Sequence, residues 1–150
     1  MSGFQSPVEQ ESLIMLLRGK QPIILFPARS IKNYRIPADW KQAYVSGRLL
    51  IISPFKNRRA TQEFGIKRNK LAAQLADAIF VAHAAPNSKT EALCKEFTKL
   101  NKPLLTFPDS GDKNLHEIGF QGDTVEYKCI GALLKRLNSD NKKELKHGII

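Results

Sequence analysis

Short apolar runs alternate with segments of helical periodicity along most of the chain. Four runs of strand length are apolar at nearly every position: residues 22–26, 49–52, 79–81 and 103–107. Strands that are apolar on both faces are typical of a parallel sheet covered by helices. We therefore expect each run to form a buried strand.

The segments between these runs predict helices. Ser6, Pro7 and Glu9 form a capping box with proline at the first helical position, and Gly19 ends that helix. Further helices are expected at residues 39–46, where Asp39 would be the cap, and at residues 60–76, 88–100, 114–118 and 130–137.

The strict alternation of strand and helix predicts one α/β domain over residues 1–150. We expect a Rossmann-like parallel sheet of at least four strands with helices on both faces. Residues 138–150 are expected to be a basic, frayed tail.

Polar turns follow the predicted strands, at residues 27–30, 53–57, 84–91 and 108–114. In a parallel α/β sheet such turns meet at the carboxyl edge, where ligands bind. Ser88, Lys89 and Thr90 open a helix after the third strand, and the free N–H groups and dipole of a helix start favour a phosphate. The spacing of Ser88 and Glu91 also predicts a plain capping box, which is the more common meaning of this motif alone.

The chain is strongly basic, with 24 Lys and Arg against 14 Asp and Glu and a net charge of +10. Residues 56–70 hold one acid, Glu63, and six cations: Lys56, Arg58, Arg59, Lys67, Arg68 and Lys70. This balance favours a polyanionic partner. Arg68 and Lys70 suit contacts with nucleic-acid phosphates, and Asn69 suits an amide hydrogen bond, while a solvated helix face is the structural alternative.

Catalytic chemistry has little support in the sequence. It contains no Ser-His-Asp order, no paired carboxylates, no G-x-G-x-x-G and no G-K-[ST] loop. His83 has no evident Asp, Cys or His partner, which favours packing or capping. The two cysteines are far apart, and we expect Cys94 to lie on the buried face of a helix. Cys94 and Cys129 therefore predict neither a disulfide framework nor a zinc site. We expect a cytoplasmic protein without a metal, a cofactor or a membrane span.

The segment from Phe64 to Ala85 resembles the DNA-processing protein A (DprA, or Smf) family. It reads F-G-I-K-R-N-K-L-A-A-Q-L-A-D-A-I-F-V-A-H-A-A, where the family has an R-R-N-R-I-I-A-G-L-S-[DE]-A-type helix before a strand. Residues 68–70 match its R-N-R, residues 88–91 its S-G-[ST] helix start, and residues 112–115 with Gly119 its G-x-N-x-L-I…G segment. Ser2 and Gly3 resemble the beginning of its S-G-G-A-R-G-I-D loop, but F-Q-S-P replaces G-A-R-G, as in a shortened or divergent member.

This resemblance implies a single-stranded DNA-binding protein of DNA uptake and recombination, with a strand-exchange recombinase and a second copy of the chain as partners. Together with the basic cluster it predicts phosphate contacts at ten residues: Arg58, Arg59, Lys67, Arg68, Asn69, Lys70, Ser88, Lys89, Thr90 and Asn114. One alternative is a nucleotide-binding module or nucleoside-monophosphate hydrolase of the same superfamily. Another is a purely structural partner with a vestigial anion site.

Overall fold

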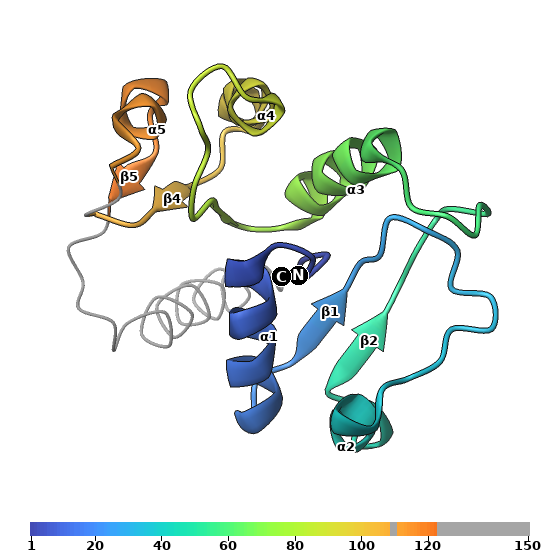
Figure 1. Cartoon of the computed structure of the whole chain (residues 1–150). Coiled ribbons are helices and arrows are strands. Elements are labelled where there is room, and N and C mark those ends of the chain that lie inside the picture. The colour runs from blue at the N-terminus through green and yellow to red at the C-terminus, as the bar shows by residue number, and fades with distance from the viewer. Residues whose placement is uncertain (109–110, 123–150) are drawn as a thin grey trace, which may run out of the picture.

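The computed structural model describes residues 1–108 and 111–122 (Figure 1). The helical elements are α1 (Pro7–Arg18), η1 (Ala38–Trp40), α2 (Lys41–Val45), α3 (Gln62–Leu75), α4 (Lys89–Phe97), η2 (Thr98–Leu100) and α5 (Lys113–Ile118). The strands are β1 (Ile23–Leu25), β2 (Leu49–Ile51), β3 (Ile79–Phe80), β4 (Leu104–Thr106) and β5 (Gln121–Gly122). The predicted helix at residues 130–137, Cys129 and the basic tail lie outside the described residues.

The strands form two small parallel sheets, which confirms the α/β class. One sheet pairs β1 with β2, and the other has the order β3-β4-β5. The four apolar runs all contain strands, and β5 is a fifth strand that the apolar pattern did not predict.

The expectation of one sheet with at least four strands is wrong for the described residues. Beside β1, on the edge away from β2, the described part of the chain contributes only an isolated bridge between Ser2 and Leu25. Ser2 N donates to Ile24 O at 3.1 Å and Phe26 N donates to Ser2 O at 2.8 Å, and no ladder continues from this pair to β3. Prolines stand at or just beyond the ends of three of the four runs, at positions 22, 27, 54, 103 and 108, and a proline cannot donate an N–H to a ladder.

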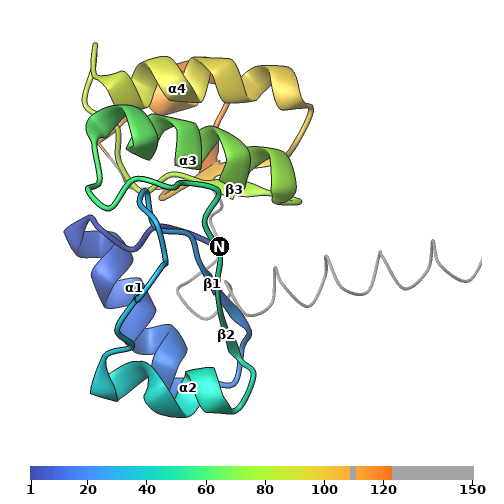
Figure 2. The same ribbon diagram turned by 90° about the vertical axis from the view of Figure 1, so that its right-hand side faces the viewer.

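The two sheets belong to two tiers with separate cores (Figures 1 and 2). We call α1, β1, α2 and β2 the lower tier, whose core contains Leu13, Leu25 and Leu49. The upper tier comprises α3, α4, α5 and strands β3 to β5, and its core surrounds Cys94 and Leu115, which have no exposed surface. The predicted burial of Cys94 is thus confirmed, and burial raises the pKa of its thiol to about 11, which keeps it protonated and unreactive.

The sequence predicts the N-cap of α1 correctly and the cap of the following helical turn incorrectly. At α1 the capping box is present, with Ser6 N donating to Glu9 Oε2 at 2.9 Å. The expected Asp39 cap is wrong, because the turn begins earlier: Trp40 N donates to Pro37 O, and Asp39 lies inside η1. None of the helices described is long and apolar enough to cross a bilayer.

Candidate phosphate-binding site

Arg68 connects the two tiers. It projects from α3 with only 5% of its surface exposed, and its Nη1 donates to Phe26 O in the lower tier at 3.2 Å. The guanidinium also packs on Gly3, where a Cβ atom would lie 1.0 Å from Nη1, so no larger residue fits there unless Arg68 moves. These contacts hold the N-terminal segment, the end of β1 and α3 together.

The Arg68 guanidinium retains an unused donor. Its Nε is buried and has no hydrogen-bond partner among the described residues. Burial lowers the pKa of Arg68, and the negative charge of Glu9 offsets part of this change, yet an arginine remains protonated in proteins. A buried cation with an unsatisfied N–H is unfavourable unless a polar partner reaches it.

The Arg68 side chain lines a surface cavity of about 400 Å³, which we call the arginine cavity. Its other described lining residues come from the N-terminal segment, the start of α3 and the start of α4: Gln5, Ala60, Thr61, Gln62, Gly65, Ile66, Asn69, Lys89, Thr90 and Leu93. None of these residues is acidic. Lys89 Nζ donates to Gln62 Oε1 at 2.5 Å, which ties the two helix starts together. The cavity therefore presents two cations, two hydroxyl groups and amide groups to a ligand.

A second cavity of about 560 Å³ adjoins the first, since both include Gln5 and Ala60. We call it the aromatic cavity, because three rings line it together with three arginines: Phe4, Tyr34, Trp40, Arg29, Arg58 and Arg59. The guanidinium carbon of Arg29 lies 5.2 Å from the centre of the Tyr34 ring. The described lining of this cavity also lacks acidic side chains.

The predicted basic stretch on α3 does not form one wall. Successive residues of a helix are rotated by about 100°, so Arg68 points inward while Lys67 and Lys70 lie on another side. Lys67 Nζ lies 2.6 Å from Glu63 Oε1, and Lys70 Nζ lies 2.6 Å from Glu96 Oε2. Neither lysine lines the arginine cavity or the aromatic cavity, whereas Arg68 and Asn69 line the arginine cavity.

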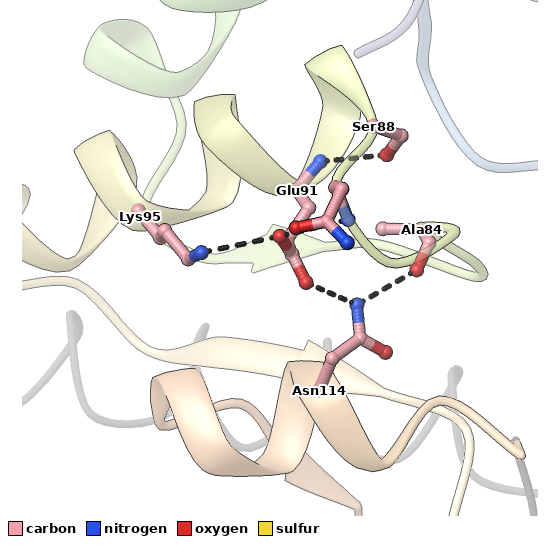
Figure 3. Close-up of polar contacts among 6 residues, drawn as sticks. Ala84, Ser88, Glu91, Lys95 and Asn114 are labelled. Carbon is pink, nitrogen blue, oxygen red and sulfur yellow. Dashed lines mark hydrogen bonds and ion pairs between the residues drawn. The ribbon is translucent and has the colours of Figure 1, made fainter.

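The turn before α4 is organised around its own carboxylate (Figure 3). Ser88 Oγ accepts from Glu91 N at 3.1 Å, as a helix cap does. The Glu91 carboxylate is buried and accepts from Asn114 Nδ2 at 2.7 Å, from Lys95 Nζ at 3.1 Å and from Asn87 N at 3.2 Å. Asn114 Nδ2 also donates to Ala84 O at 2.9 Å. We call this group of residues the Glu91 network.

The Glu91 network leaves little for an external anion. The hydrogen bond from Asn114, followed by that from Lys95, lowers the pKa of Glu91, so the group is a carboxylate at neutral pH. The start of α4 therefore already has a negative charge beside it. An amide nitrogen has two N–H donors, and Asn114 uses both within the protein. Of the predicted residues in this region, only Lys89 and Thr90 face the arginine cavity.

His83 does have an acidic partner, contrary to the sequence-based expectation. Its Nδ1 lies 2.6 Å from Oδ1 of the buried Asp112, while the imidazole is largely exposed. The fold brings the start of α5 against the turn after β3, a proximity that spacing along the chain does not reveal. The carboxylate fixes the orientation of the ring.

Within residues 1–108 and 111–122, no group of three or more His, Cys, Asp or Glu side chains could hold a metal ion.

Several cavity residues were missed in the sequence: Gln5, Arg29, Tyr34, Trp40, Thr61 and Gln62. One of them carried a local signal, because Thr61 precedes a helical segment and its Oγ1 caps α3 by accepting from Phe64 N. The others come from the N-terminal segment, the loop after β1, η1 and the first turn of α3, so only the fold places them together. Comparisons with protein-family models, with curated proteins and with solved structures give no match to this chain.

Proposed function

We propose that this chain is a Rossmann-like protein that binds single-stranded DNA through its phosphates at the arginine cavity and at the arginines of the adjoining aromatic cavity. One observation carries the proposal: Arg68 is a buried cation with an unused Nε donor at a cavity without acidic lining. A phosphate supplies the negative charge that the described lining of this cavity lacks.

The surrounding charges support a polyanion as the ligand. Lys89 lies at the arginine cavity, and Arg29, Arg58 and Arg59 lie at the aromatic cavity, so the positive charges extend across both. If about four phosphates are neutralised, affinity for a single strand should fall with salt at a log–log slope near −3. The resemblance to the DNA-processing protein A family extends this proposal to DNA uptake and recombination, with a strand-exchange recombinase as a partner.

A second candidate is binding of a single nucleotide. The arginine cavity has a volume typical of small-ligand sites and contains one deeply buried arginine. This candidate predicts saturation by a nucleoside monophosphate with a weak dependence on salt, because only one phosphate is neutralised.

The two candidates are separated by fluorescence anisotropy with labelled oligodeoxythymidylate over a range of salt. Nucleoside monophosphate and duplex DNA serve as competitors. The informative variant is Arg58→Ala/Arg59→Ala, which should weaken strand binding roughly tenfold or more and reduce the salt slope by about 1.4, since two phosphate contacts are lost.

The matched control is Lys67→Ala/Lys70→Ala, which removes the same charge away from both cavities. We expect less than about a threefold change, because both lysines are exposed, lie outside both cavities and are already paired with Glu63 and Glu96. Equal losses in the two double variants would mean general attraction to a basic surface and would contradict the proposed site. Competition by the monophosphate at stoichiometric concentration would favour the second candidate.

A further inference from the structure

The aromatic cavity combines features that phosphate binding alone does not require. Its rings come from three separate segments: Phe4 from the N-terminal segment, Tyr34 from the loop after β1, and Trp40 from η1. All three are only partly buried, although they pack on the lower core. Rings needed only for the core would be expected to face away from a cavity rather than line it.

The backbone holds the first of these rings in an unfavourable conformation. Phe4 has φ = 50°, a left-handed value that costs about 1–3 kcal/mol for a bulky residue. Hydrogen bonds on both sides fix this segment: Ser2 bridges to β1, and Gln5 N donates to Glu9 Oε2 at 3.1 Å. Strained residues that the surroundings hold in place are concentrated at ligand sites.

We propose that the aromatic cavity holds an unpaired nucleobase of the bound strand. This inference rests on the proposed function, because the base belongs to the strand whose phosphates the arginines bind. Aromatic rings beside arginines are the chemistry with which proteins bind single strands, since each base presents a face for stacking and each phosphate a charge. Gln5 and Ala60 line both this cavity and the arginine cavity, so phosphate and base binding would take place on neighbouring parts of one surface.

The base subsite gives the protein a means to discriminate between single and double strands. In a duplex, each base is paired and stacked, and it must be extruded before it can enter a cavity. Phosphate contacts alone carry no such discrimination, because both forms present phosphates. The preference for single strands therefore depends on Tyr34 and Trp40 and not on the arginines.

The test compares two strands of equal length, oligodeoxythymidylate and a deoxyribose-phosphate strand without bases. Trp40 is the only tryptophan of the chain, so its intrinsic fluorescence reports on the subsite in the unaltered protein. We expect quenching by the thymidylate strand and little change with the abasic strand. Direct titration should show tighter binding of the thymidylate strand by roughly 5- to 100-fold, the range for stacking of one base.

Variants then identify the rings responsible. Tyr34→Leu/Trp40→Leu keeps apolar volume for the lower core and should remove the preference for the thymidylate strand while leaving abasic binding within about twofold. Trp40→Phe should retain most of the preference, and a thermal melt verifies that each variant is folded. Arg58→Ala/Arg59→Ala should weaken both strands equally.

The outcomes separate the two proposals. If the unaltered protein binds both strands equally and Trp40 fluorescence does not change, the base subsite is refuted while phosphate binding stands. If the folded leucine variant loses both strands alike, the rings do not bind a base. If neither strand binds the unaltered protein, the proposed function itself fails.

Discussion

Arg68 and Glu91 are two buried charged residues of the upper tier, and they differ in how far the protein satisfies their hydrogen-bonding groups. Arg68 is 5% exposed and has an unused Nε donor, whereas Glu91 is 6% exposed and accepts from three protein groups. Each residue is anchored on a long helix and reaches across to another part of the molecule. The difference indicates which region is open to a ligand: the arginine cavity lacks an anion, and the Glu91 network already contains one.

This comparison separates two regions for which the sequence analysis predicted phosphate contacts. The turn at residues 88–91 has the composition of an anion site, but Ser88 and Glu91 already have hydrogen-bond partners within the protein. The Arg68 region has no glycine-rich phosphate motif, yet it leaves a buried cation incompletely paired. Buried polar groups in native proteins are nearly always satisfied, so an exception is informative about a missing partner.

The largest effect is expected from Gly3→Ala. The added methyl group would lie 1.0 Å from Arg68 Nη1, so the guanidinium must leave its position. We expect the free energy of unfolding to fall by about 1–3 kcal/mol, as for an overpacked core. Strand binding should weaken roughly tenfold or more, because one charge-assisted phosphate contact is lost. Urea unfolding and anisotropy measure the two effects.

Arg68→Ala and the Gly3→Ala/Arg68→Ala double variant complete a cycle around this contact. Removing Arg68 leaves space for the methyl group, so the double variant should be more stable than the sum of the single effects by about 1–2 kcal/mol. Binding should remain weak in all three variants. Normal strand binding by a folded Gly3→Ala protein would show that the position of Arg68 is not needed for the ligand.

The contrast between the two regions also explains what the sequence could predict. Apolar runs and capping residues are local signals, so β1 to β4, α1 and the Ser88 cap followed from them. Helical geometry separates the direction of Arg68 from that of Lys67 and Lys70, since successive residues are rotated by about 100°. That Arg68 is the one that points inward needed the fold. Its contact with Phe26 O joins positions 42 residues apart and needed the fold. The same holds for the Asp112 partner of His83 and for the rings of the aromatic cavity.

The second effect concerns the Glu91 network. Asn114→Ala removes the donor to Ala84 O and to Glu91 Oε1, and unsatisfied buried acceptors cost about 1–3 kcal/mol in total. We expect this loss in the free energy of unfolding and a change of less than about twofold in strand affinity, because the network lies outside both cavities. The neighbouring exposed Lys113→Ala is the control and should alter stability by less than about 0.5 kcal/mol. A large loss of binding by a folded Asn114→Ala protein would return the start of α4 to the ligand site.

The smallest effect is a pH dependence of stability that tests the charge of Glu91. Since the pKa of Glu91 in the folded protein lies below its usual value of 4.5, the unfolded chain takes up this proton first as the pH falls. The stability that the carboxylate contributes is therefore complete above its usual pKa and is lost as the pH falls through its folded value. Glu91→Gln keeps an acceptor for Asn114 without a charge, so the difference in free energy of unfolding between wild type and variant should be widest near neutral pH and should narrow in acid.

Urea unfolding between about pH 6 and about pH 3 measures this gap. The contributions of the other carboxylates cancel in the difference, because both proteins share them. A gap of constant size would mean that Glu91 stabilises the turn by shape and hydrogen bonding alone, and its charge would then no longer explain why the start of α4 excludes a phosphate.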